Sequence, residues 1–283
     1  EEDRRDAKKH NVKIIETLKC VGLEEAYWLG YPPDNFDTNI VIGHDIKLGW
    51  PGHVIRRLCG AKWVHVVHTN AEEVGIHRNR EGEISRGEDK QEIQMNLCEI
   101  ADLVVTVGPK LKSSVSVSAC SSDKVFNFTP GLFEEFVNER KELNKGNRFD
   151  ILLFGRGDPE DLEVKGFQTA VDAFCTLKRE DKTYNMMIVG APEGSQDDLM
   201  AKLTSSSADS PRPLIRRYVE DREELKKIFI GVDLVLMPSK TDGFGLAGLE
   251  ALSAGVAILV SSNCGLAEIL EKIANGSQCI VEA

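Results

Sequence analysis

The sequence lacks the features that mark membrane, secreted and zinc-binding proteins. Its 283 residues contain no apolar run long enough to span a membrane, and the opening stretch, EEDRRDAKKH, does not resemble a secretory signal. The seven cysteines are an odd number and include no C-x-x-C pair, so neither disulfide bridges nor a zinc site is indicated. We therefore expect reduced thiols, no membrane span and a cytoplasmic location.

Positive charge is scarce as well. The chain has 35 Lys and Arg residues against 46 Asp and Glu residues, a formal net charge of -11 at pH 7. Because a nucleic-acid-binding protein must neutralise backbone phosphates, this balance argues against nucleic acid as the main partner. It does not exclude a small anionic ligand, since a few arginines or lysines can line one cleft.

What the sequence does contain is an alternation of short apolar runs and helical stretches, which is typical of parallel sheets covered by helices. In the first half we predict strands at 13–16, 39–44, 63–68, 103–108 and 125–128, with helices near 49–59 and 88–101. In the second half we predict strands at 150–157, 185–190, 214–219, 232–237 and 256–261, with helices near 166–178, 194–205, 221–230 and 246–254. A polar stretch, ERKELNKGNR, interrupts the pattern. We therefore place a boundary between two α/β domains near 141–149, which gives domains 1–147 and 148–283.

One glycine-rich stretch, SKTDGFGLAGLEALSAG, begins at Ser239 and contains the spacing G-x-G-x-x-G, with its first glycine at Gly243. A dinucleotide-binding turn needs that first glycine directly after a strand, and an acid at the tip of the next strand. Here five residues separate the predicted strand from Gly243, and the next strand ends in Ser-Ser-Asn. A dinucleotide site is therefore not indicated.

A nucleotide-sugar site fits this stretch better. Its glycines allow the backbone to enter a helix closely, so the N–H groups of Phe244, Gly245 and Leu246 can face an anion. Glu250, about one turn into the helix, can accept the hydroxyls of a ribose, and Asp242 can reach those of an attached sugar. The alternative is a core helix loosened by glycine, with Glu250 directed to solvent, and this stretch alone does not decide between the two.

The longer run SKTDGFGLAGLEALSAGVAILVSSNCGLAEIL closely resembles the signature of retaining glycosyltransferases of GT-B fold, in the family 4-like group that includes sucrose-phosphate synthase. The pattern of that group is an acid, seven residues and then a glutamate, and this chain has Asp242 and Glu250 at that spacing. The group usually has glutamate at the first position, so Asp242 is shorter by one methylene and its reach toward a sugar differs. The resemblance spans most of the chain.

Two cations belong to the same resemblance. FGRGDPEDLEVKGF places Arg156 after a predicted strand and Lys165 just before a predicted helix, and two cations on successive loop ends can clamp a diphosphate. The family has an Arg and a Lys-Gly that hold the donor pyrophosphate, which implies this role for Arg156 and Lys165. The next glycine loop of the family resembles MIVGAPEG, which implies that Gly190 lets the donor approach. The family segment that contacts the base resembles IRRYVEDREELKKIF.

Two histidines stand at the ends of predicted strands in the first half. VIGHDIKLG resembles the H-G-H-Y-x-D-x-G region of the family, which implies a catalytic position for His44. VHVVHTN puts His68 at the next strand end, where the family often has a second histidine, and this implies a place on the acceptor side. A histidine at a strand end is also common as a structural residue, so both interpretations stay open.

The resemblance implies two Rossmann-like domains whose parallel sheets face across a cleft. The N-terminal domain is expected to be incomplete, because the strand and Gly-Gly loop that open family members are not matched. The implied activity is transfer of a sugar, with retention, from a UDP- or GDP-linked donor to an unidentified acceptor, without a further cofactor. Its catalytic residues would be His44, Arg156, Lys165 and Asp242.

Two further expectations concern metal and alternative functions. No D-x-D motif occurs, so we expect metal independence, with Arg156, Lys165 and the helix N-terminus stabilising the charge of the leaving group. A second hypothesis is a non-catalytic nucleotide-sugar-binding module within a larger polypeptide. A third is an epimerase of GT-B fold. Release of nucleotide from nucleotide sugars, with and without acceptor, distinguishes the first two hypotheses.

Overall fold

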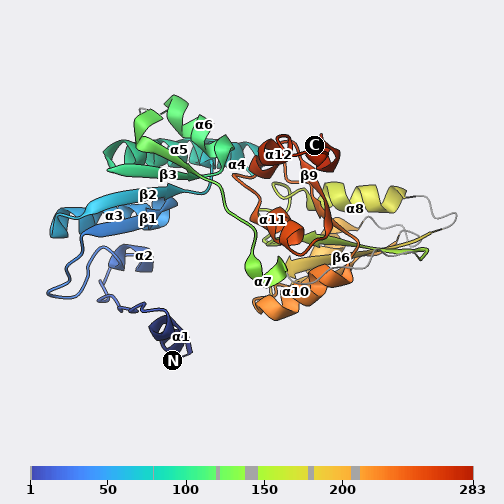
Figure 1. The fold of residues 1–283 in the computed structure, drawn as a ribbon, viewed down its shortest axis with the longest axis horizontal. Coiled ribbons are helices and arrows are strands. Elements are labelled where there is room, and N and C mark those ends of the chain that lie inside the picture. Colours follow the sequence, from blue (N-terminus) through green and yellow to red (C-terminus); the bar gives the residue numbers. More distant parts are fainter. Residues whose placement is uncertain are drawn as a thin grey trace. The chain divides into compact units, whose positions relative to one another are not determined.

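The structure is a computed structural model that describes residues 2–78, 80–118, 122–137, 146–177, 182–204 and 211–282. These residues form two parallel sheets with surrounding helices (Figure 1). By its internal contacts the chain divides into two compact units, unit 1 (Glu1–Val67, Ile93–Val105 and Val115–Phe126) and unit 2 (His68–Glu92, Thr106–Ser114 and Asn127–Ala283). The predicted boundary at 141–149 lies partly outside the described residues. The predicted domains 1–147 and 148–283 follow the order of the two sheets along the chain, and their boundary stays a prediction.

The first sheet has four strands in the order β1-β2-β3-β4. They are β1 (Ile40–His44), β2 (Lys62–Val67), β3 (Leu103–Val107) and β4 (Val125–Phe128), which confirms four of the predicted strands. Trp63, His65 and Val67 alternate along β2 and are buried, because the side chains on one face of a strand point the same way, here into the core. Along the chain between these strands lie α3 (Asp45–Cys59), α4 (Ala71–His77), α5 (Glu83–Ile100), α6 (Pro109–Ser118) and the short 3-10 helix η1 (Ser122–Lys124). Of these, α4 and the first parts of α5 and α6 belong to unit 2.

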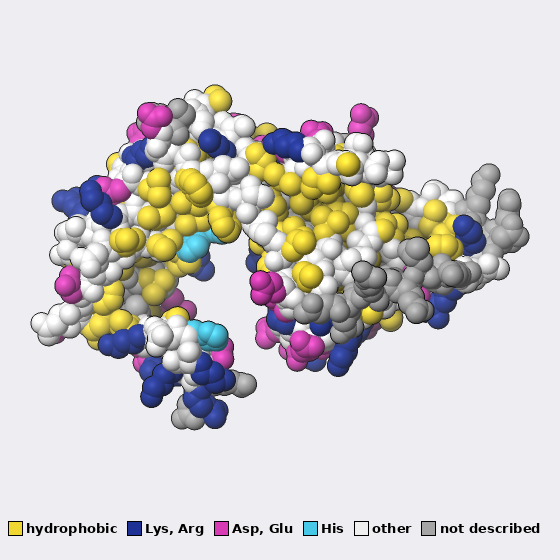
Figure 2. All heavy atoms as spheres, viewed as in Figure 1, with side chains coloured by type: hydrophobic (Ala, Val, Ile, Leu, Met, Phe, Trp, Pro, Cys, Tyr) yellow, Lys and Arg dark blue, Asp and Glu magenta, His cyan; other side chains and the backbone are white. Residues whose placement is uncertain are grey.

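The predicted strand at 13–16 is wrong. The segment between α1 (Glu2–Lys9) and α2 (Glu25–Trp28) has no regular structure, and Ile14 and Ile15 are exposed. A strand needs a neighbour to pair its backbone N–H and C=O groups, and no described strand pairs with this run. The charged opening stretch instead forms α1, on which Lys and Arg side chains gather (Figure 2).

The second sheet has six strands in the order β10-β9-β8-β5-β6-β7. They are β5 (Arg148–Phe154), β6 (Thr183–Ala191), β7 (Leu214–Arg217), β8 (Leu234–Met237), β9 (Ala257–Ser261) and β10 (Ile280–Val281). All neighbouring pairs in this sheet are parallel. Five of these strands match the five predicted for the second half.

Helices cover both faces of this sheet, with α8 and α10 on opposite sides (Figure 1). The helices are α7 (Glu134–Val137), α8 (Phe167–Thr176), α9 (Gln196–Leu203), α10 (Arg222–Gly231), α11 (Leu246–Ser253), α12 (Gly265–Leu270) and the 3-10 helix η2 (Gly276–Cys279). Phe167, Val171 and Phe174 recur at helical spacing on α8 and are buried in the core against Ile151 and Ile188 of the sheet. Of the described helices, none is long and apolar enough to cross a membrane.

Candidate functional site

In the second sheet, the direction in which the chain adds strands reverses between β5 and β8. From β5 the chain proceeds through β6 to β7 on one side, and it then returns to add β8 and β9 on the other side. The loops at the carboxyl ends of β5 and β8 therefore diverge, which opens a crevice of the kind that holds ligands in open α/β sheets. The loop after β5 contains Arg156 and Lys165, and the loop after β8 contains Asp242.

A cavity of about 450 Å³ lies at this edge of the sheet, and all of its lining residues belong to unit 2. Eight of the residues predicted from the sequence line it. They are His68, Arg156, Lys165, Asp242, Phe244, Gly245, Leu246 and Glu250. Two strand ends and the first turn of α11 thus converge on one cavity.

The two acids of the acid–x7–Glu pattern are both engaged by cations. Asp242 accepts a hydrogen bond from Lys165 Nζ at 2.6 Å on one carboxylate oxygen, and from the Phe244 backbone N–H at 3.3 Å on the other. Glu250 accepts from Arg222 Nη1 at 2.6 Å, and only 12% of its side chain is exposed. Neither acid is therefore an unpaired buried charge, which would cost several kcal/mol or more. The core-helix alternative predicted that Glu250 is directed to solvent. Its side chain instead lines the cavity.

The entry of the chain into α11 depends on Gly245. This residue has φ +101°, in the left-handed region, and a Cβ there would overlap the side chains of Cys264 and Met237. Glycine is the residue that adopts this conformation without strain. Because the chain turns here, the first turn of α11, with Leu246 and Ala247, lies at the cavity. The N–H groups of a first helical turn have no partner within the helix.

The two predicted cations differ in their surroundings. Lys165 lies one residue before Gly166, the N-cap of α8, and its side chain is held by Asp242. Arg156 is exposed and its guanidinium forms no ion pair with any part of the chain that the structure describes. Arg78 pairs with Asp161 at 2.7 Å, which fastens the loop that carries both cations. Arg156 is thus available to an anion in the cavity.

A partly buried ion-pair network supports Thr241, the residue before Asp242. Lys110, at the start of α6, donates to Thr241 Oγ1 at 3.0 Å and to the Asn263 carbonyl at 2.8 Å, and it pairs with Glu73 at 2.6 Å. Thr241 also donates to Glu73. Burial raises the pKa of the Glu73 carboxyl, but the hydrogen bonds from Lys110 and Thr241 outweigh it, so the pKa lies below its usual range. The network therefore fixes the loop at Thr241, and Asp242 is the next residue of that loop.

Two predicted glycines lie beside the cavity's loops without lining it. A Cβ on Gly190 would overlap the carbonyl oxygen of Gly155, and a Cβ on Gly243 would overlap that of His68. Gly190 therefore allows β6 to pack closely on the loop after β5, and Gly243 allows the loop after β8 to pack closely on His68. His44 ends β1 in unit 1, where it is the N-cap of α3, and its catalytic role stays a prediction.

Sequence reasoning missed several residues of the cavity wall, above all Arg222. The others are Val107, Phe154, Gly155, Tyr218, Val219, Glu220, Leu225 and Ala247. Several of these belong to IRRYVEDREELKKIF, so a signal for the segment was present. The signal did not identify Arg222, because its partner Glu250 is 28 residues away in the sequence.

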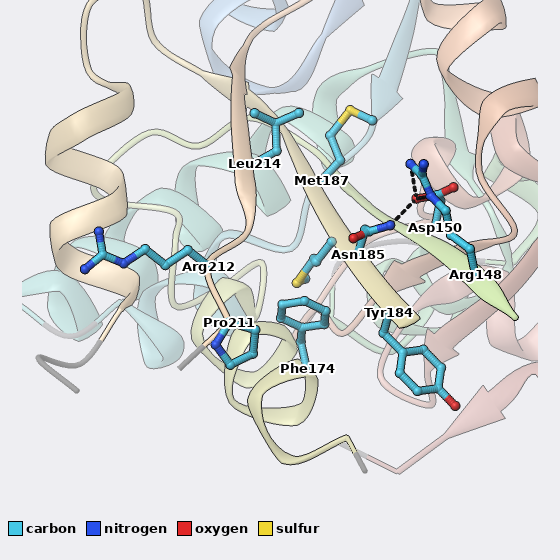
Figure 3. A pocket seen from close by; sticks show the side chains of 10 residues that line it. Arg148, Asp150, Phe174, Tyr184, Asn185, Met187, Pro211, Arg212 and Leu214 are labelled. Atoms are coloured by element: carbon cyan, nitrogen blue, oxygen red, sulfur yellow. Dashed lines mark hydrogen bonds and ion pairs between the residues drawn. The ribbon is translucent and has the colours of Figure 1, made fainter. Parts of the chain in front are cut away.

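A further cavity of about 450 Å³ lies at the opposite, amino edge of the second sheet (Figure 3). Arg148 and Asn185 both point to the carboxylate of Asp150, at 3.0 Å and 2.9 Å. Phe174 and Leu214 supply part of its apolar wall. None of the residues predicted from the sequence lines it, so those residues select the cavity at the carboxyl edge. Within the described residues, no three His, Cys, Asp or Glu side chains are placed to hold a metal ion.

The family described as "Family 4 Glycosyltransferase in conflict systems" matches the chain over residues 1–283. The chain belongs to this family. This family 4 glycosyltransferase chain is 26% identical over 257 residues to an uncharacterized glycosyltransferase of Methanocaldococcus jannaschii, covering 86% of the chain and 62% of that protein. It is 26% identical over 246 residues to a D-inositol 3-phosphate glycosyltransferase of Corynebacterium urealyticum, covering 81% of the chain and 56% of that protein. The chain thus spans less than two thirds of the length of either relative.

Solved structures of similar fold include sucrose-phosphate synthase from Thermosynechococcus elongatus, with a TM-score of 0.64 at 20% identity, covering 81% of this chain and 57% of that one. A UDP-forming trehalose-phosphate synthase from Burkholderia xenovorans has a TM-score of 0.59 at 15% identity, covering 86% of this chain and 62% of that one. These similarities establish the fold. The family 4 chain has the GT-B fold class that its sequence predicted.

Proposed function

We propose that this family 4 chain transfers a sugar from a nucleoside diphosphate sugar to an acceptor hydroxyl, with retention of anomeric configuration. One observation carries the proposal. The two acids of the family pattern and the two predicted phosphate-binding cations line a single cavity at the carboxyl edge of the second sheet. Retention and a UDP- or GDP-linked donor are inferred from the family resemblance, which leaves the acceptor unidentified.

The donor is proposed to bind with its charges matched to this cavity. Glu250 accepts hydroxyls of the ribose, while Arg156 and Lys165 neutralise the diphosphate together with the first turn of α11. Gly245 and Leu246 bring the backbone close to that phosphate, while the Phe244 N–H is bonded to Asp242. The base, uracil or guanine, lies toward Tyr218, Val219 and Glu220 on the same wall.

Donor binding is proposed to break the Lys165–Asp242 ion pair and to give each of the two side chains a new partner. Lys165 Nζ lies 2.6 Å from Asp242, and 34% of its side chain is exposed. When a nucleotide sugar binds, Lys165 turns to the phosphate and Asp242 accepts hydroxyls of the sugar in its place. The sugar and the phosphate it leaves are then held by neighbouring groups.

In the proposed reaction, an acceptor oxygen forms a bond to the anomeric carbon on the face from which the diphosphate departs. The bond between the anomeric carbon and the phosphate oxygen breaks, and the acceptor proton passes to the departing phosphate. Negative charge that develops on the phosphate is stabilised by Arg156, Lys165 and the helix N-terminus, so no divalent metal is needed for it. His68 and His44 are proposed for the acceptor side and for a catalytic position, respectively.

The proposal is tested by incubating the chain with UDP-glucose and with GDP-mannose, and measuring released nucleoside diphosphate in the presence of EDTA. Inositol 3-phosphate is a suitable trial acceptor, because D-inositol 3-phosphate stands in the name of a relative. We expect release of nucleoside diphosphate, and we expect this release to depend on Lys165. By NMR, the anomeric configuration of the sugar in the product should be the same as in the donor. Inversion would overturn retention, and loss of activity in EDTA would overturn metal independence. Binding without release under any acceptor would favour the nucleotide-sugar-binding module.

A further inference from the structure

Arg222 joins two glutamates that are far apart in the sequence. Its Nη1 donates to Glu250 at 2.6 Å, and its Nε and Nη2 donate to one carboxylate oxygen of Glu135 at 3.1 Å and 2.6 Å. Glu250 lies in α11, Glu135 in α7, and Arg222 is the first residue of α10. One guanidinium therefore fixes the relative placement of three helices of unit 2 around the cavity.

The guanidinium is held in place by more than its charge. It stacks on the ring of Phe136 at 4.8 Å and on that of Phe133 at 5.4 Å, measured to the ring centroids. Asp221, the preceding residue, caps α10 by accepting from the Glu224 N–H, so the backbone at Arg222 is also fixed. Burial lowers the pKa of Arg222, but its bonds to Glu250 and Glu135 raise it by more, so it stays charged.

Arg222 leaves one oxygen of Glu250 for a ligand. Its bond is to Oε1, and no other described residue donates to the Glu250 carboxylate. A carboxylate fixed at one oxygen presents the other in a single direction, and such preorganisation reduces the entropy lost when a ligand binds. The Glu250 side chain also lines the cavity.

We propose that Arg222 is the positioning residue that directs Glu250 at the hydroxyls of the donor's ribose, and that it thereby sets the preference for ribonucleotides over deoxyribonucleotides. This inference rests on the proposed function, since it assumes that the cavity holds a nucleoside diphosphate. Arg222 acts through Glu250 and need not touch the reacting atoms.

The test compares UDP with 2′-deoxy-UDP, and GDP with 2′-deoxy-GDP, by isothermal titration calorimetry. Wild type is expected to prefer each ribonucleotide by about tenfold or more, the effect of one hydrogen bond to a charged group. Arg222→Met should lower this preference to about twofold or less, because Glu250 is no longer held toward the ribose. Glu135→Gln should retain most of the preference, since Arg222 still pairs with Glu250.

Arg148→Met is the matched control. It removes an arginine from a two-bond contact with Asp150 at the opposite edge of the same sheet, and it should leave the preference unchanged. Thermal unfolding confirms that each variant is folded before titration.

The outcomes separate the inference from the function on which it rests. If wild type binds none of the four nucleotides, the proposed function fails. If wild type prefers ribonucleotides and Arg222→Met keeps that preference, the donor site stands and the role of Arg222 is wrong. If Arg222→Met weakens ribonucleotides and deoxyribonucleotides equally, Arg222 serves the phosphate or the fold, and the inference is again overturned.

Discussion

At the residue scale, both acids of the cavity are paired with a cation. Lys165 donates to Asp242 and Arg222 donates to Glu250, each at 2.6 Å, and both acids line the cavity. In the proposed function each of them also accepts hydroxyls of the donor. Their spacing, an acid and a glutamate separated by seven residues, was visible in the sequence. The partner of Asp242, Lys165, could also be predicted, because it lies in the Arg and Lys-Gly pattern of the family. The partner of Glu250, Arg222, lies in no such pattern.

We predict that Glu250→Ala lowers the affinity for nucleoside diphosphates by about 1.5–3 kcal/mol for each hydrogen bond lost to the ribose. The fold should survive, because Arg222 keeps its bonds to Glu135. Calorimetry on the folded variant measures the change, with Glu223→Ala, an exposed glutamate of α10, as the control. Equal affinity of Glu250→Ala and wild type would remove Glu250 from the donor site.

We predict a different result for Asp242→Asn. The asparagine can still accept from the Phe244 N–H, but it no longer holds Lys165 as an ion pair. Affinity for a nucleoside diphosphate should therefore be unchanged or higher, while affinity for the intact nucleotide sugar falls. Titration with UDP and with UDP-glucose makes the comparison. A parallel loss for both ligands would show that Asp242 serves the phosphate site or the fold.

At the element scale, sequence patterns predicted nine of the ten described strands and six of the twelve described α-helices. They failed where an element depends on a distant neighbour. The run at 13–16 has the composition of a strand, yet it has no strand beside it among the described residues. The prediction of five strands in the second half was correct because each of these apolar runs has a neighbouring strand on at least one side. The contact of α7 with α10 through Glu135 and Arg222 follows from packing, which a local pattern does not contain.

The start of α11 gives a prediction at this scale. Gly245→Ala should destabilise the fold by more than the roughly 1–2 kcal/mol of a left-handed alanine, since the new methyl would also overlap Cys264 and Met237. Gly255, just after α11, is also left-handed but has open space around it. Gly255→Ala should therefore cost the backbone term alone. Urea unfolding of both variants measures the difference, and equal destabilisation would mean that the packing around Gly245 relaxes freely.

At the scale of the whole molecule, the Glu73–Lys110–Thr241 network gives unit 2 an acid-sensitive contact. The pKa of Glu73 is lowered from its usual 4.5 in the folded state. A group with a lowered folded pKa stabilises the protein above its unfolded pKa, and that contribution is lost as the pH falls through the folded value. We predict that Glu73→Gln flattens the fall in unfolding free energy below about pH 4.5.

Chemical denaturation at pH 7 and at pH 3.5–4.5 measures this dependence. Glu72→Gln is the matched control, because Glu72 is exposed and is the adjacent residue of α4. If the unfolding free energies of Glu73→Gln and Glu72→Gln fell equally with decreasing pH, the network would make no contribution to the acid dependence of stability.

The pairing of β5 with both β6 and β8 has a kinetic consequence. Lys165 and Asp242 are 77 residues apart, and Arg222 and Glu135 are 87 apart, so the cavity closes long loops of the chain. Contacts of such separation form late, because the entropy of closing the loops is lost before the contacts are gained. We therefore expect the cavity to be incomplete in the folding transition state. If the proposed donor site binds a nucleotide, that nucleotide should slow unfolding far more than it speeds refolding, because the complete site is present only in the native state.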